Sequence, residues 1–234
     1  MARKIAIHQP YYLPWLGFLH KVYSCDVFVI NDSSEFEKKD FTRRAKLDSE
    51  SYLDIPLESH SDFEKIINLK INNENWRNKH VYKIFNNYRN HSLFKENIEF
   101  IEYTIFRTKY INNLTELNLQ ILDDILKLLG ISRTIVRTSN YHIPGKKEES
   151  VINIIKHFNG DEYISGAAAS AYQDKAHFES NGIRLIYQDM YSYLNDNPYK
   201  QKGKQFQNGL CFVDPLFNIG AEGIMKILKE YRME

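Results

Sequence analysis

A histidine and a glutamine stand at the end of the first apolar run of the chain, which reads KIAIHQPYYLPWLGFLHKV over residues 4–22. The imidazole of His8 titrates near neutral pH, so it can act as an acid, a base or a phosphate contact. The amide of Gln9 can both donate and accept hydrogen bonds. Pro10 and Pro14 stiffen the loop and limit the entropy lost when a ligand orders it. A hydrogen-bonded structural histidine is the alternative interpretation of His8.

Three aromatic residues in the same loop can stack on a nucleotide base or on a sugar face: Tyr11, Tyr12 and Trp15. Trp15 begins an apolar helical face, so we expect it to pack in the core. Two adjacent tyrosines are not easily buried together. We therefore expect one of the pair to contact a ligand.

Charged residues follow the second apolar run. Asp32 can meet a ribose hydroxyl or a metal-bound phosphate, and a turn or helix-cap role is the alternative. Arg43, Arg44 and Lys46 form a cationic cluster that suits phosphate or carboxylate groups. Composition alone favours a solvated face for this cluster.

A run of small residues, Ser165-Gly166-Ala167-Ala168-Ala169, lies between a predicted strand and a predicted helix and would let a ligand approach the backbone. It matches neither the dinucleotide nor the Walker pattern. We expect His8, Asp32, Arg44 and Ser165 to line one cavity. Cys25 and Cys211 have apolar neighbours, so we expect buried structural thiols rather than nucleophiles.

The elements that position these residues follow from hydrophobic patterning. Apolar runs predict buried strands at 5–7 and 26–30 around a helix, which is the strand–helix–strand unit of a parallel sheet. The ranges expected further along the chain are an edge strand over 52–57, a strand over 66–71, helices across 73–130, strands at 134–136, 163–164 and 183–187, and helices over 149–158 and 172–180.

These patterns predict an α/β fold: a Rossmann-like, mostly parallel sheet with a helical insertion and an antiparallel edge. Residues 1–72 hold the first unit and the edge strands, 73–130 the insertion, and 131–234 the C-terminal α/β part of the same sheet. Ligands bind at the carboxyl ends of strands in such sheets, where the polar loops named above fall.

Composition limits the class of protein. The chain has 234 residues, 43% hydrophobic and 14% aromatic, which is typical of a globular protein. Its net charge is +1, which argues against nucleic-acid binding. We find neither a signal peptide nor an apolar run long enough to enter a membrane, and we expect a cytoplasmic protein.

The sequence resembles the WbqC-like family of bacterial proteins. The resemblance rests on HQPYYLPWLGFLHKV, DVFVIND, FEKKDFTRRAKL, YLDIPL, YISGAAASAY, NPYKQ and FQNGLCFVDPLFNIG, so it runs from the first strand to Gly220. It implies a place in O-antigen and other surface-polysaccharide biosynthesis. The implied reaction is transfer of an acyl or aminoacyl group, glycyl being the usual suggestion, to an amino sugar.

The resemblance also implies site residues. We assign catalysis to His8, Gln9 and Asp32, with no metal ligands. The substrate-binding residues implied are Tyr12, Arg44, Lys46, Ser165, Gly166, Tyr172, Tyr199, Gln201, Asp214 and Asn218.

The expected partners are a nucleotide-linked amino sugar and an acyl- or aminoacyl-carrier protein. The cofactor stays open between such a carrier and ATP with Mg²⁺. Two alternative functions remain at this point: an ATP-dependent ligase or nucleotidyl-transfer enzyme, and a non-catalytic subunit of a glycan-assembly complex.

Overall fold

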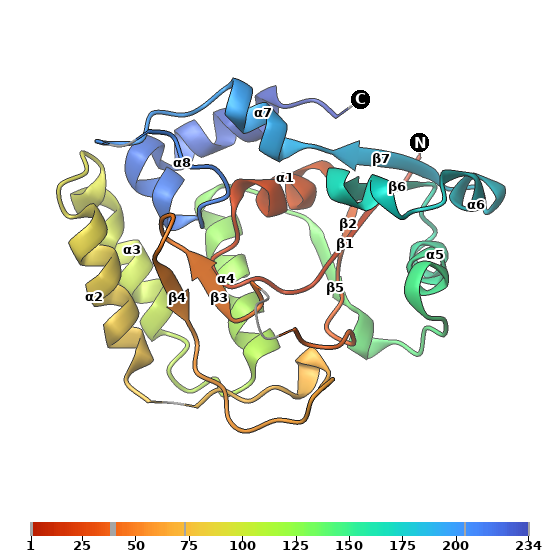
Figure 1. The fold of residues 1–234 in the computed structure, drawn as a ribbon, viewed down its shortest axis with the longest axis horizontal. Coiled ribbons are helices and arrows are strands. Elements are labelled where there is room, and N and C mark those ends of the chain that lie inside the picture. Colours follow the sequence, from red (N-terminus) through yellow and green to blue (C-terminus); the bar gives the residue numbers. More distant parts are fainter. Residues whose placement is uncertain (1, 38–40, 73, 204, 234) are drawn as a thin grey trace.

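A five-stranded parallel sheet forms the centre of the computed structural model, which describes residues 2–37, 41–72, 74–203 and 205–233 (Figure 1). Its order is β5-β2-β1-β6-β7, and every neighbouring pair is parallel. The five strands are β1 (Lys4–His8), β2 (Val27–Ile30), β5 (Thr134–Arg137), β6 (Glu162–Gly166) and β7 (Arg184–Gln188). The predicted Rossmann-like sheet is confirmed.

Both faces of the sheet are buried at β1 and β2, which explains why Ile5-Ala6-Ile7 and Val27–Ile30 are apolar without alternation. Ile5 and Ile7 pack in one core cluster, whereas Ala6 packs in the other. Two helices cover the first face, α5 (Lys147–His157) and α6 (Lys175–Ser180), on the right of Figure 1. The helices whose side chains join the second cluster include α1 (Leu16–Ser24), α4 (Leu114–Leu128), α7 (Met190–Asp196) and α8 (Val213–Glu230).

A long insertion separates β2 from β5. Its helices are α2 (Trp76–Tyr88), α3 (Phe94–Phe106) and α4, as the helical pattern over 73–130 predicts. Two short strands precede them, β3 (Arg44–Lys46) and β4 (Tyr52–Asp54). They pair antiparallel in a sheet of their own, so the antiparallel element is not an edge of the central sheet. Residues 38–40 of the charged run before β3 lie outside the described residues.

Two expected elements differ from the structure. The predicted strand over 66–71 is wrong at its start, where Ile66–Asn68 forms a 3₁₀ helix, η1. Ile66 and Leu69 are three residues apart and both buried, which is the period of a 3₁₀ turn. The helix expected from 172 begins only at Lys175, because the Asp174 side chain accepts from His177 N and caps it. A 3₁₀ helix, η3 (Ala167–Ala171), precedes it.

The loop after β2 is fixed to the end of β5 by one buried carboxylate. Asp32 is fully buried and its Oδ2 accepts from Arg137 Nε at 2.8 Å and from Ser139 Oγ at 2.8 Å. Its Oδ1 accepts from Ser139 N at 3.0 Å and from Thr138 Oγ1 at 3.2 Å. Both oxygens therefore accept hydrogen bonds from the protein, and Asp32 links the end of β2 to the end of β5.

We expect Asp32→Ala to lower the free energy of unfolding by about 3 kcal/mol, because it leaves the guanidinium and hydroxyl donors without their acceptor. Chemical denaturation measures the loss. Asp123→Ala is the matched control: it breaks an exposed ion pair with Lys127 and should cost no more than about 0.5 kcal/mol. Equal losses in the two variants would contradict the structural role of Asp32.

Candidate functional site

A cavity of about 480 Å³ lies at the carboxyl ends of β1, β6 and β7. Strand order reverses between β1 and β6, since the chain winds outward from β1 through β2 to β5 and then returns to β6 on the other side. Such a switch point is where doubly wound sheets bind ligands. The residues that line the cavity include His8 from β1, Lys21 from α1, Gly166 from β6, and Gln188 and Asp189 after β7.

His8 supplies this cavity with a neutral imidazole. Burial, together with the positive charge of Lys21, lowers the pKa of His8 to about 3. Its Nδ1 lies 3.0 Å from the carbonyl oxygen of Gln9, which only accepts, so Nδ1 donates and Nε2 carries the lone pair. Ring contacts with Tyr11 at 4.4 Å and Phe18 at 4.9 Å fix the orientation.

Lys21 is the cation of the same cavity. Its side chain comes from α1 one turn after Gly17 and Phe18, which also line the cavity. The residue is only 8% exposed, and burial lowers the pKa of its ammonium to about 8. A Cβ placed on Gly166 would lie 3.5 Å from Lys21 Nζ, so the end of β6 passes beside the amine.

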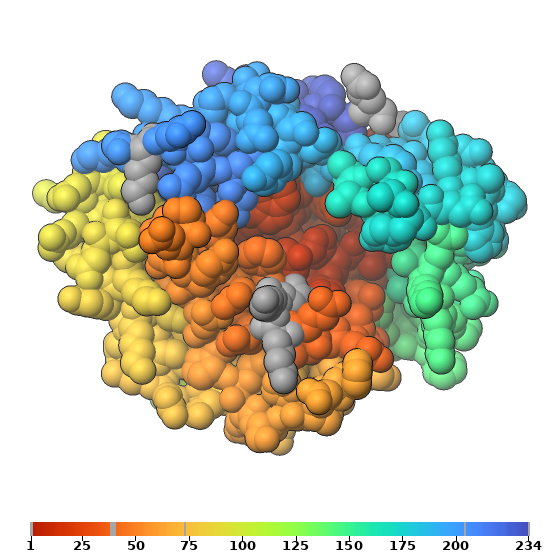
Figure 2. Space-filling view, viewed as in Figure 1, coloured from red at the N-terminus to blue at the C-terminus, as the bar shows by residue number. Residues whose placement is uncertain are grey.

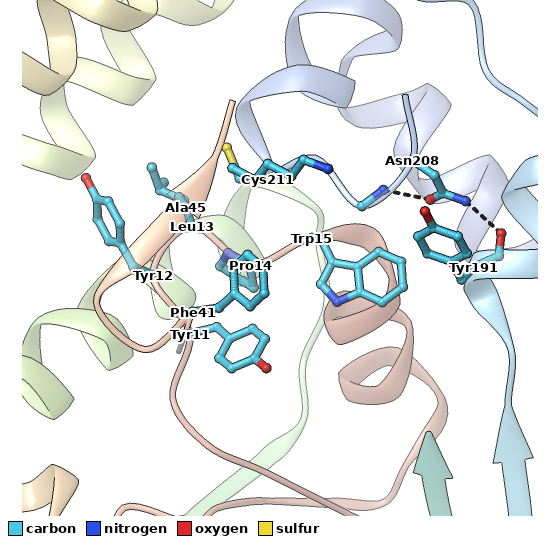
Figure 3. Close-up of a pocket in the computed structure, with 12 residues that line it drawn as sticks. Tyr11, Tyr12, Leu13, Pro14, Trp15, Phe41, Ala45, Tyr191, Asn208 and Cys211 are labelled. Atoms are coloured by element: carbon cyan, nitrogen blue, oxygen red, sulfur yellow. Dashed lines mark hydrogen bonds between the residues drawn. The ribbon is translucent and has the colours of Figure 1, made fainter. Parts of the chain in front are cut away.

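A second cavity of about 270 Å³ adjoins the first and shares the aromatic walls of Tyr11, Trp15 and Tyr191. Figure 3 shows Trp15 beside Tyr191, with Tyr11, Pro14 and Phe41 forming the other side. In the space-filling view the red N-terminal segment lies recessed between the blue C-terminal, teal and orange segments (Figure 2). The neighbouring cavities therefore form one extended site, polar at the sheet and aromatic beyond it.

The two predicted cations of the β3 strand differ in their surroundings. Arg44 makes a two-pronged ion pair with Asp54, at 2.9 Å and 3.2 Å, and stacks on the Tyr52 ring at 4.7 Å. Lys46 lines the aromatic cavity. Arg44 is thus engaged within its own hairpin, whereas Lys46 remains at the site.

Several residues that the sequence or its resemblance singled out do not line either cavity, among them Gln9, Asp32, Arg44, Ser165 and Tyr172. Gln9 donates to Ser34 Oγ at 3.0 Å. Ser165 is buried and alternates along β6 with Gly166, so its side chain points to the opposite face of the sheet. Tyr172 is 78% exposed. The structure does not bring His8, Asp32, Arg44 and Ser165 into one cavity.

Tyr12 lines the aromatic cavity but is 1% exposed. Burial lowers the pKa of His80 to about 4, so the ring is neutral. His80 Nε2 faces the backbone oxygen of Asp54 at 3.1 Å and donates to it, and Nδ1 accepts from the Tyr12 hydroxyl at 2.9 Å. Of the adjacent tyrosines, Tyr11 is therefore the one with exposed surface at the site.

The remaining predicted residues form a separate network around Asp214. Its Oδ2 accepts from the Tyr199 hydroxyl at 2.6 Å and from Gln201 Nε2 at 2.9 Å. Its Oδ1 accepts from Asn218 Nδ2 at 3.2 Å and from the Tyr88 hydroxyl at 3.2 Å. This network joins the segment before α8 to α2, and it borders a cavity of only about 30 Å³.

Cys25 and Cys211 are both buried, and burial raises the pKa of each thiol to about 12. A protonated buried thiol is a poor nucleophile.

Sequence reasoning missed Lys21 and Tyr191. A lysine on a nine-residue helix is normally expected to be exposed. Lys21 is buried because the segments after β6 and β7, far along the chain, cover it. One signal was available: Lys21 lies one turn from Phe18, on the apolar face of the predicted helix.

The sheet defines a doubly wound α/β protein with a cavity at the switch point between β1 and β6. The chain belongs to the WbqC-like protein family, whose model matches residues 9–226. It is similar to an uncharacterised protein of Mycobacterium tuberculosis, 29% identical over 224 residues that cover 94% of this chain and 95% of the relative. No solved structure matches the chain.

Across the described part of the chain, no helix has the length and apolar character needed to cross a membrane.

The pH dependence of stability tests the burial of Lys21. Its pKa in the folded protein, about 8, is below the ordinary value of 10.5, so the unfolded chain binds more protons between these values. Burial of the ammonium destabilises the fold below pH 8, and this penalty disappears as pH rises to 10.5. We expect Lys21→Met to be more stable than the wild type by roughly 2–4 kcal/mol at pH 7 and by progressively less toward pH 10.5.

Urea denaturation across this pH range measures the difference. Lys226→Met, which replaces an exposed lysine of α8, should give a small difference that does not change with pH. A Lys21→Met difference that is also constant with pH would contradict the burial of a charged amine.

Proposed function

We propose that this protein transfers an acyl or aminoacyl group, of the glycyl type, to the amine of a nucleotide-linked amino sugar in bacterial surface-polysaccharide biosynthesis. The observation that carries the proposal is a neutral imidazole, His8, at the switch point of the sheet, next to an aromatic cavity. The reaction needs a proton acceptor for the amine, and aromatic walls offer faces on which a sugar or base ring can bind.

The chemistry assigns His8 the role of general base. The sugar amine attacks the carbonyl carbon of an activated acyl group, a nitrogen–carbon bond forms, and the bond to the leaving group breaks. The amine must lose a proton during this step. His8 Nε2 is free to accept it, because Nδ1 is held by the backbone oxygen of Gln9 and no described residue donates to Nε2. The pKa of about 3 makes the imidazole a weak base in the unliganded protein. The leaving group then takes the proton from the imidazolium.

The aromatic cavity is the proposed place for a sugar or nucleobase ring. Tyr11, Trp15 and Tyr191 offer ring faces, and Lys46 lines the same cavity. Asn208 adds a polar edge, although its amide donates to the backbone oxygen of Tyr191 at 2.6 Å (Figure 3). Aromatic faces bind sugar C–H surfaces and bases without needing charge complementarity.

The alternative of an ATP-dependent ligase gains no support from Asp32, the carboxylate predicted to lie near a ribose or a metal-bound phosphate. Asp32 is fully buried and both of its oxygens accept protein hydrogen bonds. A magnesium ion would need at least one of these oxygens in its coordination sphere. A non-catalytic subunit remains an outcome of the test below.

The test is a transfer assay with a uridine diphosphate-linked 4-amino sugar and an activated glycyl thioester. We expect amide formation by the wild type, and none when the sugar amine is already acetylated. His8→Phe should lower kcat by about 10²–10⁴-fold while KM changes little, because a phenyl ring keeps the packing but cannot accept a proton. Product analysis by mass spectrometry provides the readout.

His142→Phe is the matched control, since His142 is exposed and lines neither cavity. It should transfer at the wild-type rate. Full activity in a folded His8→Phe protein would remove His8 from the chemistry. Binding of the sugar nucleotide with no transfer from any activated donor would favour a non-catalytic subunit.

A further inference from the structure

Lys21 is an exception among the buried charges of this protein. Buried charges are normally paired or hydrogen-bonded, since an isolated charge is costly to remove from water. The other buried charged side chains each have a protein partner: Asp32 with Arg137, Arg77 with Thr108, Asp124 with Arg107, Glu162 with Arg184, and Asp214 with Tyr199. Within the described residues, the Lys21 amine has no hydrogen-bond or ion-pair partner.

No carboxylate of the described structure forms an ion pair with Lys21, although one lines the cavity. Asp189 is the carboxylate that lines it among the described residues, and its oxygens cap α7 by accepting from Ser192 N at 3.0 Å and Ser192 Oγ at 2.8 Å. Gln188 is uncharged, and its amide nitrogen donates to the backbone oxygen of Gly17 at 3.0 Å. The imidazole of His8 is neutral. A bound anion would supply the ion pair that the described residues do not give Lys21.

We propose that Lys21 is the counter-ion of a phosphate group, and that the cavity at the β1–β6 switch point binds a diphosphate-bearing ligand. The cavity has room for such a group, and the side-chain-free Gly166 borders the amine. The sequence predicts this role for Arg44 and Lys46. The Arg44 guanidinium is instead held by Asp54, and Lys46 lines the neighbouring aromatic cavity. The proposal rests on the proposed function only for identifying the diphosphate as part of a sugar nucleotide.

Ligand binding at Lys21 would also act on His8. The titratable groups that line the cavity are His8, Lys21, Tyr11, Asp189 and Tyr191. The positive charge of Lys21 contributes to the low pKa of His8. A phosphate beside Lys21 neutralises that charge and raises the pKa of His8, which makes the imidazole a stronger proton acceptor. The base would then be strongest when the substrate is bound.

Calorimetry with inorganic pyrophosphate tests the proposal without a sugar or an acyl donor. We expect wild-type protein to bind pyrophosphate and uridine diphosphate, and Lys21→Met to bind each at least about tenfold more weakly, as for loss of a charge-assisted hydrogen bond. Uridine, which lacks phosphate, should not distinguish the two proteins. Lys226→Met is the control for loss of a lysine charge elsewhere and should bind both anions normally.

Acetate distinguishes a carboxylate ligand from a phosphate. Lys21-dependent binding of acetate without Lys21-dependent binding of pyrophosphate would overturn the proposal and assign the amine to the acyl group. Equal pyrophosphate affinities in wild type and Lys21→Met, or no pyrophosphate binding at millimolar concentration, would also overturn it. Lys21-dependent binding of pyrophosphate in a protein that fails the transfer assay would retain this site and reject the transfer reaction.

Discussion

The parallel pairing of β1 with β6 is the constraint on which the rest of the structure depends. The two strands are joined in register from Lys4–Glu162 to Ala6–Ile164, and each continues for two residues, to His8 and Gly166. The chain leaves these ends in different directions, because β1 leads into the segment before α1 and β6 leads into η3. A gap opens where the two connections part, and the first turns of α1 and α7 close its sides. The residues at this gap come from two segments, 8–21 and 166–191, which are far apart in the chain and which the sheet brings together.

The buried charges of the described residues are of two kinds, those with a protein partner and one without. The structural charges are satisfied within the protein, as Asp32 is at the ends of β2 and β5 and Asp214 is at the start of α8. Lys21 is buried to a similar degree but lacks such partners in the described structure. Its burial destabilises the fold at neutral pH, a cost that binding can recover when a ligand supplies the opposite charge. Within the described structure, Lys21 is a buried charge without a partner, whereas the other buried charges are paired. Such unpaired buried charges are typical of functional sites.

Much of the fold could be predicted because its signals are local. The apolar runs of β1 and β2 predict strands buried on both faces. The end of the first run predicts that His8 lies at the carboxyl end of β1. The sites of Asp32 and Arg44 could not be predicted, since their partners Arg137 and Asp54 are chosen by tertiary packing. Lys21 could not be recognised as buried, because helical periodicity places it near the apolar face but does not reveal the loops after β6 and β7 that cover it. The resemblance placed Tyr199, Gln201 and Asp214 in the same site as His8. Their spacing in the sequence could not show that they form a separate network away from the cavity at the sheet.

The central claim is that His8 and Lys21 face one ligand in the cavity at the β1–β6 switch point. A crystal structure of the protein with a bound uridine diphosphate-linked amino sugar tests this claim most directly. The account predicts a phosphate oxygen within hydrogen-bond distance of Lys21 Nζ, the sugar amine near His8 Nε2, and a ring against Trp15 or Tyr191. A ligand bound beside Arg44 and Asp54, or at the Asp214 network, with the switch-point cavity empty, would contradict it.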